Sequence, residues 1–152
     1  CDGLDAIVIS VGGGGLIGGT ASYLKSVWAD IHVIGCSPEN SAVMLHSIKA
    51  GKILDLESKP TLSDGTAGGV EENTITFPVC CEVIDESVLV TEDEIKEAMV
   101  LYIEKEHQLL EGAAGTAVAA LLKKKANLKG LRVGVVICGG NISLDTVRRF
   151  LN

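Results

Sequence analysis

Short apolar runs alternate with segments of helical pattern along most of this chain. Residues 6–11, 31–36 and 132–137 are rich in Val and Ile and predict buried strands, while residues 87–90 predict a brief fourth strand. Strands that alternate with helices favour parallel pairing, because each parallel partner is reached through a crossover. The pattern therefore predicts an α/β fold, with a mainly parallel sheet and helices on both of its faces.

Helix boundaries are visible at two points between these strands. Residues 91–94 (TEDE) form a capping box, in which the Thr91 hydroxyl caps the first turn and Glu94 reaches back. Gly51 ends a shorter helix. Residues 52–86 are the least periodic, and part of this stretch is expected to form a long functional loop. Helices are expected at residues 16–28, 43–50, 95–103, 115–126 and 145–151.

The composition is that of one soluble globular domain: 152 residues, 47% hydrophobic and 22% charged. A net charge of −7 argues against non-specific nucleic-acid binding, which needs a basic face. No apolar run approaches the roughly 20 residues of a membrane span, so no membrane partner is expected. The cysteines are odd in number and two are adjacent, which favours reduced thiols in a cytoplasmic or organelle-matrix protein over a disulfide framework. Of these, a cytoplasmic location is expected. The cysteines are Cys1, Cys36, Cys80, Cys81 and Cys138.

Four consecutive glycines, Gly12 to Gly15, stand between the first strand and the first helix. Glycines let the backbone approach a ligand closely, and the exposed N–H groups at a helix start attract anions, most often phosphate. A tight turn without a ligand would need only one glycine. The spacing of Gly13, Gly15 and Gly18 also fits a nicotinamide-dinucleotide site. That site requires an acidic residue at the end of the second strand to bind the ribose hydroxyls, and this chain has Ser37 there.

Three segments, taken in order, resemble one enzyme family. Residues 10–19 (SVGGGGLIGG) are similar to the family's tetraglycine phosphate loop. Residues 87–96 (SVLVTEDEIK), followed by residues 110–115 (LEGAAG), are similar to its strand, capped helix and Glu-containing turn. Residues 137–144 (ICGGNISL) are similar to the end of a late strand in the family. Residues 61–65 (TLSDG) match more weakly. The chain thus resembles the fold-type II pyridoxal-phosphate enzymes, specifically the threonine/serine dehydratase and serine racemase group. The resemblance implies part of the large domain of a tryptophan-synthase-beta-like fold.

The resemblance assigns cofactor-binding roles to eight positions. The glycine loop and the next backbone N–H would bind the phosphate of pyridoxal 5′-phosphate, and a thiol would lie against the pyridine nitrogen. Such a thiol cannot hold that nitrogen protonated as a carboxylate would, which suits a reaction that loses a β-substituent at once. The implied residues are Gly12, Gly13, Gly14, Gly15 and Leu16 for the phosphate, Cys138 for the nitrogen, Gly65 near the ring or its phenolic oxygen, and Glu111 facing the pocket.

Three of these positions also have simpler interpretations. Cys138 at a strand end is often a buried small hydrophobic residue. Glu111 could instead cap the helix that follows it. Gly65 could serve only the turn after Asp64.

The resemblance implies that the chain is part of an ammonia-lyase, which dehydrates L-threonine and/or L-serine to a 2-oxo acid and ammonia. Two alternatives are a serine racemase of the same family and a nicotinamide-dinucleotide-binding domain. The family's Schiff-base lysine and the loop for the substrate carboxylate have no counterpart here. Residues 1–152 therefore resemble a single α/β unit that binds the cofactor phosphate and forms the C-terminal half of a longer enzyme. We expect this unit to be inactive alone and to have the N-terminal half of the same enzyme as its partner. A homo-oligomer is expected. A divalent metal is not, because Ser37 and Val43 replace the carboxylates of the metal-binding members.

Overall fold

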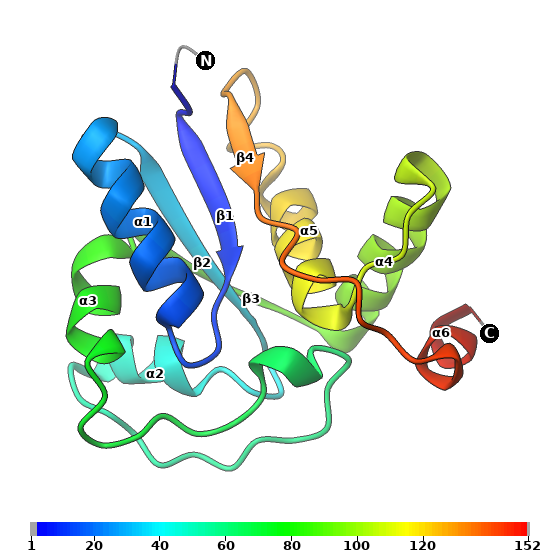
Figure 1. Cartoon of the computed structure of the whole chain (residues 1–152), viewed down its shortest axis with the longest axis horizontal. Helices are drawn as coiled ribbons and strands as arrows, with labels where there is room; N and C mark the ends of the chain where they lie inside the picture. The colour runs from blue at the N-terminus through cyan, green and yellow to red at the C-terminus, as the bar shows by residue number, and fades with distance from the viewer. Residues whose placement is uncertain (1–2, 152) are drawn as a thin grey trace.

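The computed structural model describes residues 3–151. Over this range, parallel strands form one sheet in the order β3-β2-β1-β4, so the predicted α/β fold class is confirmed (Figure 1). The strand β1 is fully enclosed because it pairs with β2 on one side and with β4 on the other. The strands are β1 (Ala6–Ser10), β2 (His32–Pro38), β3 (Glu86–Val90) and β4 (Val133–Val135).

Helices cover both faces of the sheet, as the pattern predicted. Successive strand residues point to opposite faces, so Ile7 and Ile9 pack in one apolar cluster while Ala6 and Val8 pack in another. The first cluster is completed by α1, α2 and α3, and the second by α4, α5 and α6. These helices are α1 (Gly15–Val27), α2 (Val43–Ala50), α3 (Thr76–Val83), α4 (Glu92–Glu106), α5 (Gly112–Lys124) and α6 (Leu144–Leu151).

The order of the strands places a crevice at one end of the sheet. From β1 the chain crosses through α1 to β2 on one side, whereas β4 joins β1 on the other side after α4 and α5. At such a reversal of strand order, the loops after two neighbouring parallel strands diverge and leave room for a ligand. The loops that diverge here are the glycine loop after β1 and residues 136–143 after β4.

Two expectations from the sequence need correction. The segment 132–137 was expected to be a buried strand, but β4 is shorter and only partly buried, because it is an edge strand of the sheet in residues 3–151. The long loop at residues 52–86 contains a helix, α3, as well as the short 3₁₀ turn η1 (Asp64–Thr66). The sequence TFPVCCEV has little helical propensity, and α3 forms because Cys80 and Val83 are buried against the sheet cluster.

A capping box opens α4, as predicted. The backbone N–H of Glu94 donates to Thr91 Oγ1 at 3.1 Å, and the Thr91 N–H donates to Glu94 Oε2 at 2.8 Å. The same carboxylate oxygen accepts from Lys123 Nζ at 2.9 Å, which ties the start of α4 to the end of α5. Partial burial alone would raise the pKa of Glu94, but the bonds from Thr91 and Lys123 outweigh it and lower the pKa below its ordinary 4.5.

These bonds predict a pH-dependent contribution to stability. A carboxyl whose pKa is lower in the folded state stabilises the fold above its unfolded pKa, and this contribution is lost as the pH falls through the folded pKa. We expect Glu94→Gln to lower the free energy of unfolding at neutral pH by no more than about 1 kcal/mol, since the pair is partly exposed. The difference from the parent should shrink as the pH falls below 4.5 and vanish once the pH is below the lowered pKa of the folded state. Urea denaturation across this range checks it, with the exposed Glu97→Gln on the same helix as control; a pH-independent difference would contradict it.

Candidate functional site

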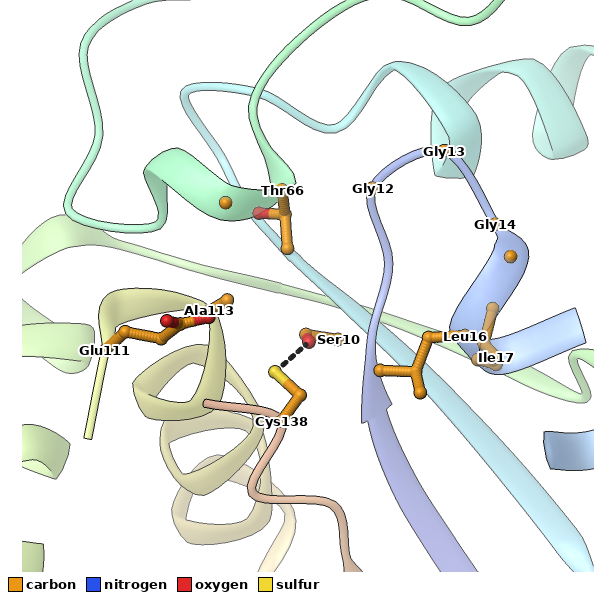
Figure 2. Close-up of a pocket in the computed structure, with 12 residues that line it drawn as sticks. Ser10, Gly12, Gly13, Gly14, Leu16, Ile17, Thr66, Glu111, Ala113 and Cys138 are labelled. Atoms are coloured by element: carbon orange, nitrogen blue, oxygen red, sulfur yellow. Dashed lines mark hydrogen bonds between the residues drawn. The ribbon is translucent and has the colours of Figure 1, made fainter. Parts of the chain in front are cut away.

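A pocket of about 300 Å³ opens in the crevice at the carboxyl ends of β1 and β4 (Figure 2). It brings together segments that are far apart in the sequence: the glycine loop, η1, the start of α5 and the strand end after β4. All eight positions singled out from the sequence line it. They are Gly12, Gly13, Gly14, Gly15, Leu16, Gly65, Glu111 and Cys138, and the other lining residues are Ser10, Ile17, Thr66 and Ala113.

The conformation of the glycine loop shows different reasons for its glycines. Gly14 is the N-cap residue of α1 and has a φ of 84°, the left-handed region that favours glycine. A Cβ on Gly14 would also lie 2.7 Å from Cys80 Sγ. A Cβ on Gly13 or Gly15 would meet no atom of the described chain within 4 Å. Gly14 is therefore required by the fold, whereas the space beside Gly13 and Gly15 is open.

This open space lies at the N-terminus of α1. Neither a side-chain cap nor an acidic first-turn residue is found there among residues 3–151. The first N–H groups of a helix have no partner within the helix, and they carry its partial positive charge. Together with the room beside Gly13 and Gly15, they form a cradle of suitable chemistry for an anion.

The loop that contains η1 closes one side of the pocket. A Cβ on Gly12 would lie 3.0 Å from the Thr66 backbone, so the two loops approach as closely as a glycine allows. At Gly65, by contrast, φ is not positive and a Cβ would meet Glu111 Oε1 at an ordinary 3.6 Å. Neither the turn nor crowding within residues 3–151 requires glycine at position 65, so the turn interpretation gains no support.

Cys138 is exposed on the pocket wall, and its Sγ lies 3.5 Å from Ser10 Oγ (Figure 2). The interpretation of Cys138 as a buried small hydrophobic residue is therefore wrong. Ser10 was missed from the sequence, although its place as the last residue of β1, two positions before Gly12, could have indicated it. Thr66 was also missed, because nothing in the sequence shows that η1 lies against Gly12.

Glu111 occupies the N-cap position of α5, yet its side chain makes no capping hydrogen bond within the described range. The capping interpretation is therefore wrong, and the carboxylate is left at the pocket. Its backbone N–H donates to Gly139 O at 3.1 Å, which joins the turn before α5 to the strand end that carries Cys138. A Cβ on Gly139 would lie 2.5 Å from the Glu111 carboxylate, so glycine at 139 keeps the place of that carboxylate free.

The cysteines fall into two classes. Burial raises the pKa of the Cys36 thiol, which donates to Ile9 O at 3.4 Å, and burial raises the pKa of Cys80 to about 11. Cys81 and Cys138 are exposed, and these four cysteines are free thiols. Cys1 lies outside the described residues.

Three lysines are held in ion pairs at the surface. Lys25 pairs with Asp85, while Lys123 and Lys124 pair with Glu94 and Glu86. None of the described lysines lines the pocket.

Ser37 is the last residue but one of β2, and its side chain is turned inward. The Ser37 hydroxyl is fully buried and donates to Val11 O at 2.8 Å. Within residues 3–151, no three His, Cys, Asp or Glu side chains gather as a metal site would require. In the same range, no helix has the length and apolar character needed to cross a membrane.

Comparisons with known proteins agree on one family. The family described as "Pyridoxal-phosphate dependent enzyme" matches residues 2–139. L-threonine ammonia-lyase of Thermotoga maritima is 38% identical over 98% of this chain and 37% of its own length. Serine racemase of Dictyostelium discoideum is 39% identical over 98% of this chain and 47% of its own length. This chain therefore spans less than half the length of these relatives.

Solved structures show the same kinship. The crystal structure of serine racemase from Dictyostelium discoideum superposes with a TM-score of 0.84 at 38% identity, covering 95% of this chain and 46% of that one. The processed form of threonine deaminase isoform 2 from Solanum lycopersicum superposes with a TM-score of 0.89 at 29% identity, covering 99% of this chain and 44% of that one.

The two kinds of glycine in the loop predict different mutational effects. We expect Gly14→Ala to lower the free energy of unfolding by at least about 1–2 kcal/mol, because the left-handed backbone and the contact with Cys80 both disfavour a Cβ. Gly13→Ala should unfold close to the parent, since its Cβ enters open space. Urea denaturation of both variants checks this. Equal losses at the two positions would show that the loop geometry is not as described.

Proposed function

The chain belongs to the pyridoxal-phosphate-dependent enzyme family, and from this membership we propose that it forms the cofactor-phosphate-binding part of an ammonia-lyase. The proposed reaction is the dehydration of L-threonine and/or L-serine to a 2-oxo acid and ammonia. The observation that carries the proposal is the gathering, around one pocket, of eight residues that the family resemblance assigns to the cofactor.

The pocket fits the phosphate end of pyridoxal 5′-phosphate. The N–H groups of the loop from Gly12 to Leu16 would bind the phosphate oxygens, because the start of α1 lacks a side-chain cap in the described structure and the space beside Gly13 and Gly15 is open. A side chain at either glycine would enter the volume that the phosphate needs. Backbone donors fixed by a strand end and a helix start hold such an anion without reorganisation.

The other wall of the pocket fits the ring. Bound pyridoxal phosphate supplies an electron sink for negative charge that develops at the substrate Cα. Cys138, exposed and 3.5 Å from Ser10, would lie against the ring nitrogen, and a thiol there brings no fixed negative charge. Glu111 would face the cofactor from the start of α5, and Gly65 would leave room beside the ring.

The names of the relatives support an amino-acid substrate. L-threonine ammonia-lyase of Thermotoga maritima and serine racemase of Dictyostelium discoideum match almost the whole chain at similar identity. Racemisation of serine is therefore the second candidate. The nicotinamide alternative loses support, because the Ser37 hydroxyl, at the position where a dinucleotide site needs an acid, is buried and bonded to Val11 O.

We further propose that residues 1–152 are one α/β unit from the C-terminal half of the enzyme. The N-terminal half would supply the Schiff-base lysine and the loop for the substrate carboxylate, and the complete protein would form a homo-oligomer in the cytoplasm. Two observations support this arrangement: this chain lacks the family's lysine and carboxylate-loop motifs, and it spans less than half the length of the relatives. The intact mass of the natural gene product tests it, and a mass equal to that of this chain would contradict it.

Phosphate recognition can be tested without any reaction at lysine. Pyridoxine 5′-phosphate carries the phosphate but no aldehyde, and pyridoxine lacks the phosphate. We expect the amide signals of Gly12 to Leu16 to shift on titration with pyridoxine 5′-phosphate and to be unaffected by pyridoxine. Gly15→Asp should weaken this binding at least about tenfold, because a charge-assisted contact is replaced by repulsion.

Gly19→Asp is the matched control for this variant. Gly19 is exposed one turn further along α1, and a Cβ there also meets open space among the described residues. It adds the same charge to the same helix outside the pocket, so it should bind nearly as the parent does. Equal loss in the two variants, or no response of the loop amides in the parent, would rule out the proposed phosphate site.

Catalysis should require more than this chain. Since none of the described lysines lines the pocket, we expect the purified chain to release no 2-oxo acid or ammonia from L-threonine or L-serine. Borohydride reduction with pyridoxal phosphate should label no single lysine stoichiometrically. For the natural gene product, 2-oxo acid and ammonia would support the lyase, D-serine would support the racemase, and turnover of neither substrate would contradict the proposal.

A further inference from the structure

Two carbonyl groups of the glycine loop accept hydrogen bonds from α3, a helix outside the pocket. Thr76 Oγ1 donates to Gly13 O at 2.6 Å. Cys80 Sγ donates to Gly14 O at 3.6 Å, and this carbonyl also accepts from Gly18 N at 2.9 Å as the first bond of α1. Figure 1 shows α3 on the opposite side of the glycine loop from α5, whose start forms part of the pocket wall.

The direction of the bond from Thr76 follows from the number of protons. A carbonyl oxygen can only accept, so the single hydroxyl proton of Thr76 is used on Gly13 O. Thr74 Oγ1 lies 2.9 Å from Thr76 Oγ1, and its hydroxyl must therefore donate in that contact. A short chain of hydroxyls, Thr74 to Thr76 to Gly13, thus ends on the loop.

The rigidity of the peptide unit carries this contact to the pocket. In a trans peptide the C=O of one residue and the N–H of the next point in opposite directions. Holding the Gly13 carbonyl toward α3 therefore directs the Gly14 N–H away from α3. In the same way, the bonds to Gly14 O direct the Gly15 N–H.

An external donor is needed because the loop cannot fix its own peptides. Gly13 and Gly14 both lack a Cβ, so rotation of the peptide between them meets little steric resistance. A flipped peptide would present a carbonyl oxygen where the phosphate needs an N–H. The hydrogen bond from Thr76 stabilises one of these two orientations.

We propose that Thr76 is a positioning residue for phosphate binding: its hydroxyl holds the peptide between Gly13 and Gly14 with the N–H available to the anion. Cys80 supports the next peptide through a longer and weaker contact. This inference rests on the proposed function and names a residue that neither the glycine motif nor the pocket lining contains. Thr76 does not touch the ligand, and it acts through the loop.

The experiment compares Thr76→Val, which keeps the shape and removes the donor, with Thr76→Ser, which keeps the donor. Pyridoxine 5′-phosphate and inorganic phosphate are titrated into the isotope-labelled chain, and the amide signals of Gly12 to Leu16 are followed. We expect Thr76→Val to bind both about fivefold more weakly, the usual value of one neutral hydrogen bond. Thr76→Ser should bind as the parent does.

A second readout separates positioning from packing. The carbonyl carbon shift of Gly13 and the amide shift of Gly14 report this hydrogen bond before any ligand is added. Both should move in Thr76→Val and return in Thr76→Ser, even where the melting temperatures of the two variants agree. If Thr76→Val loses its fold, Thr74→Val provides the test, because it removes the donor to Thr76 from outside the loop contact. Its binding should weaken in the same direction.

The outcomes distinguish the inference from the function on which it rests. If the parent binds pyridoxine 5′-phosphate at the loop and Thr76→Val binds it equally well, the positioning role is overturned while the phosphate site stands. If the parent shows no response of the loop amides, both are overturned. If Thr76→Ser is as weak as Thr76→Val, the methyl packing of Thr76 and not its hydroxyl is responsible, and the inference fails.

Discussion

The enclosed position of β1 is the constraint on which the rest of this structure depends. Its residues are 0–5% exposed, and its backbone pairs with β2 and β4 at once. The parallel register fixes the point at which the backbone leaves the sheet, next to the end of β4. The glycine loop and Cys138 therefore meet in one crevice because of strand pairing, although the contacting residues Ser10 and Cys138 are 128 positions apart in the sequence.

Glycines at the contacts between loops make the crevice compact enough to act as a site. Gly12 lets η1 approach, since a Cβ there would lie 3.0 Å from the Thr66 backbone. Gly139 leaves the space that the Glu111 carboxylate occupies, and a Cβ on Gly112 would overlap the carbonyl of Leu62. These glycines belong to different motifs in the sequence. The motifs therefore form one structural unit, because each supplies the close approach that its neighbour needs.

The sequence predicted the elements that have a strong local signal and missed those that form through tertiary contacts. The strands rich in Val and Ile, the capping box at Thr91 and the glycine loop each carry a local pattern, and all three were found. The helix α3 was missed because its first turn has no side-chain cap within residues 3–151 and its sequence favours no helix; packing of Cys80 and Val83 supplies its stability. Ser10 and Thr66 were missed because a pocket wall depends on which loops meet, and single-sequence patterns do not contain that information.

The charge of the chain shows which forces can hold an anion in this pocket. The net charge is −7, and none of the described Lys or Arg side chains lines the pocket, whereas Glu111 does. Long-range electrostatics therefore oppose a phosphate, and the attraction must come from short-range contacts with backbone N–H groups. Such contacts depend steeply on direction, because a hydrogen bond weakens as its angle departs from linearity. Because none of the described Lys or Arg side chains lines the pocket, the orientation of each loop peptide would strongly affect the affinity of the proposed phosphate site. The proposed positioning role of Thr76, on a helix that does not reach the pocket, follows from this dependence.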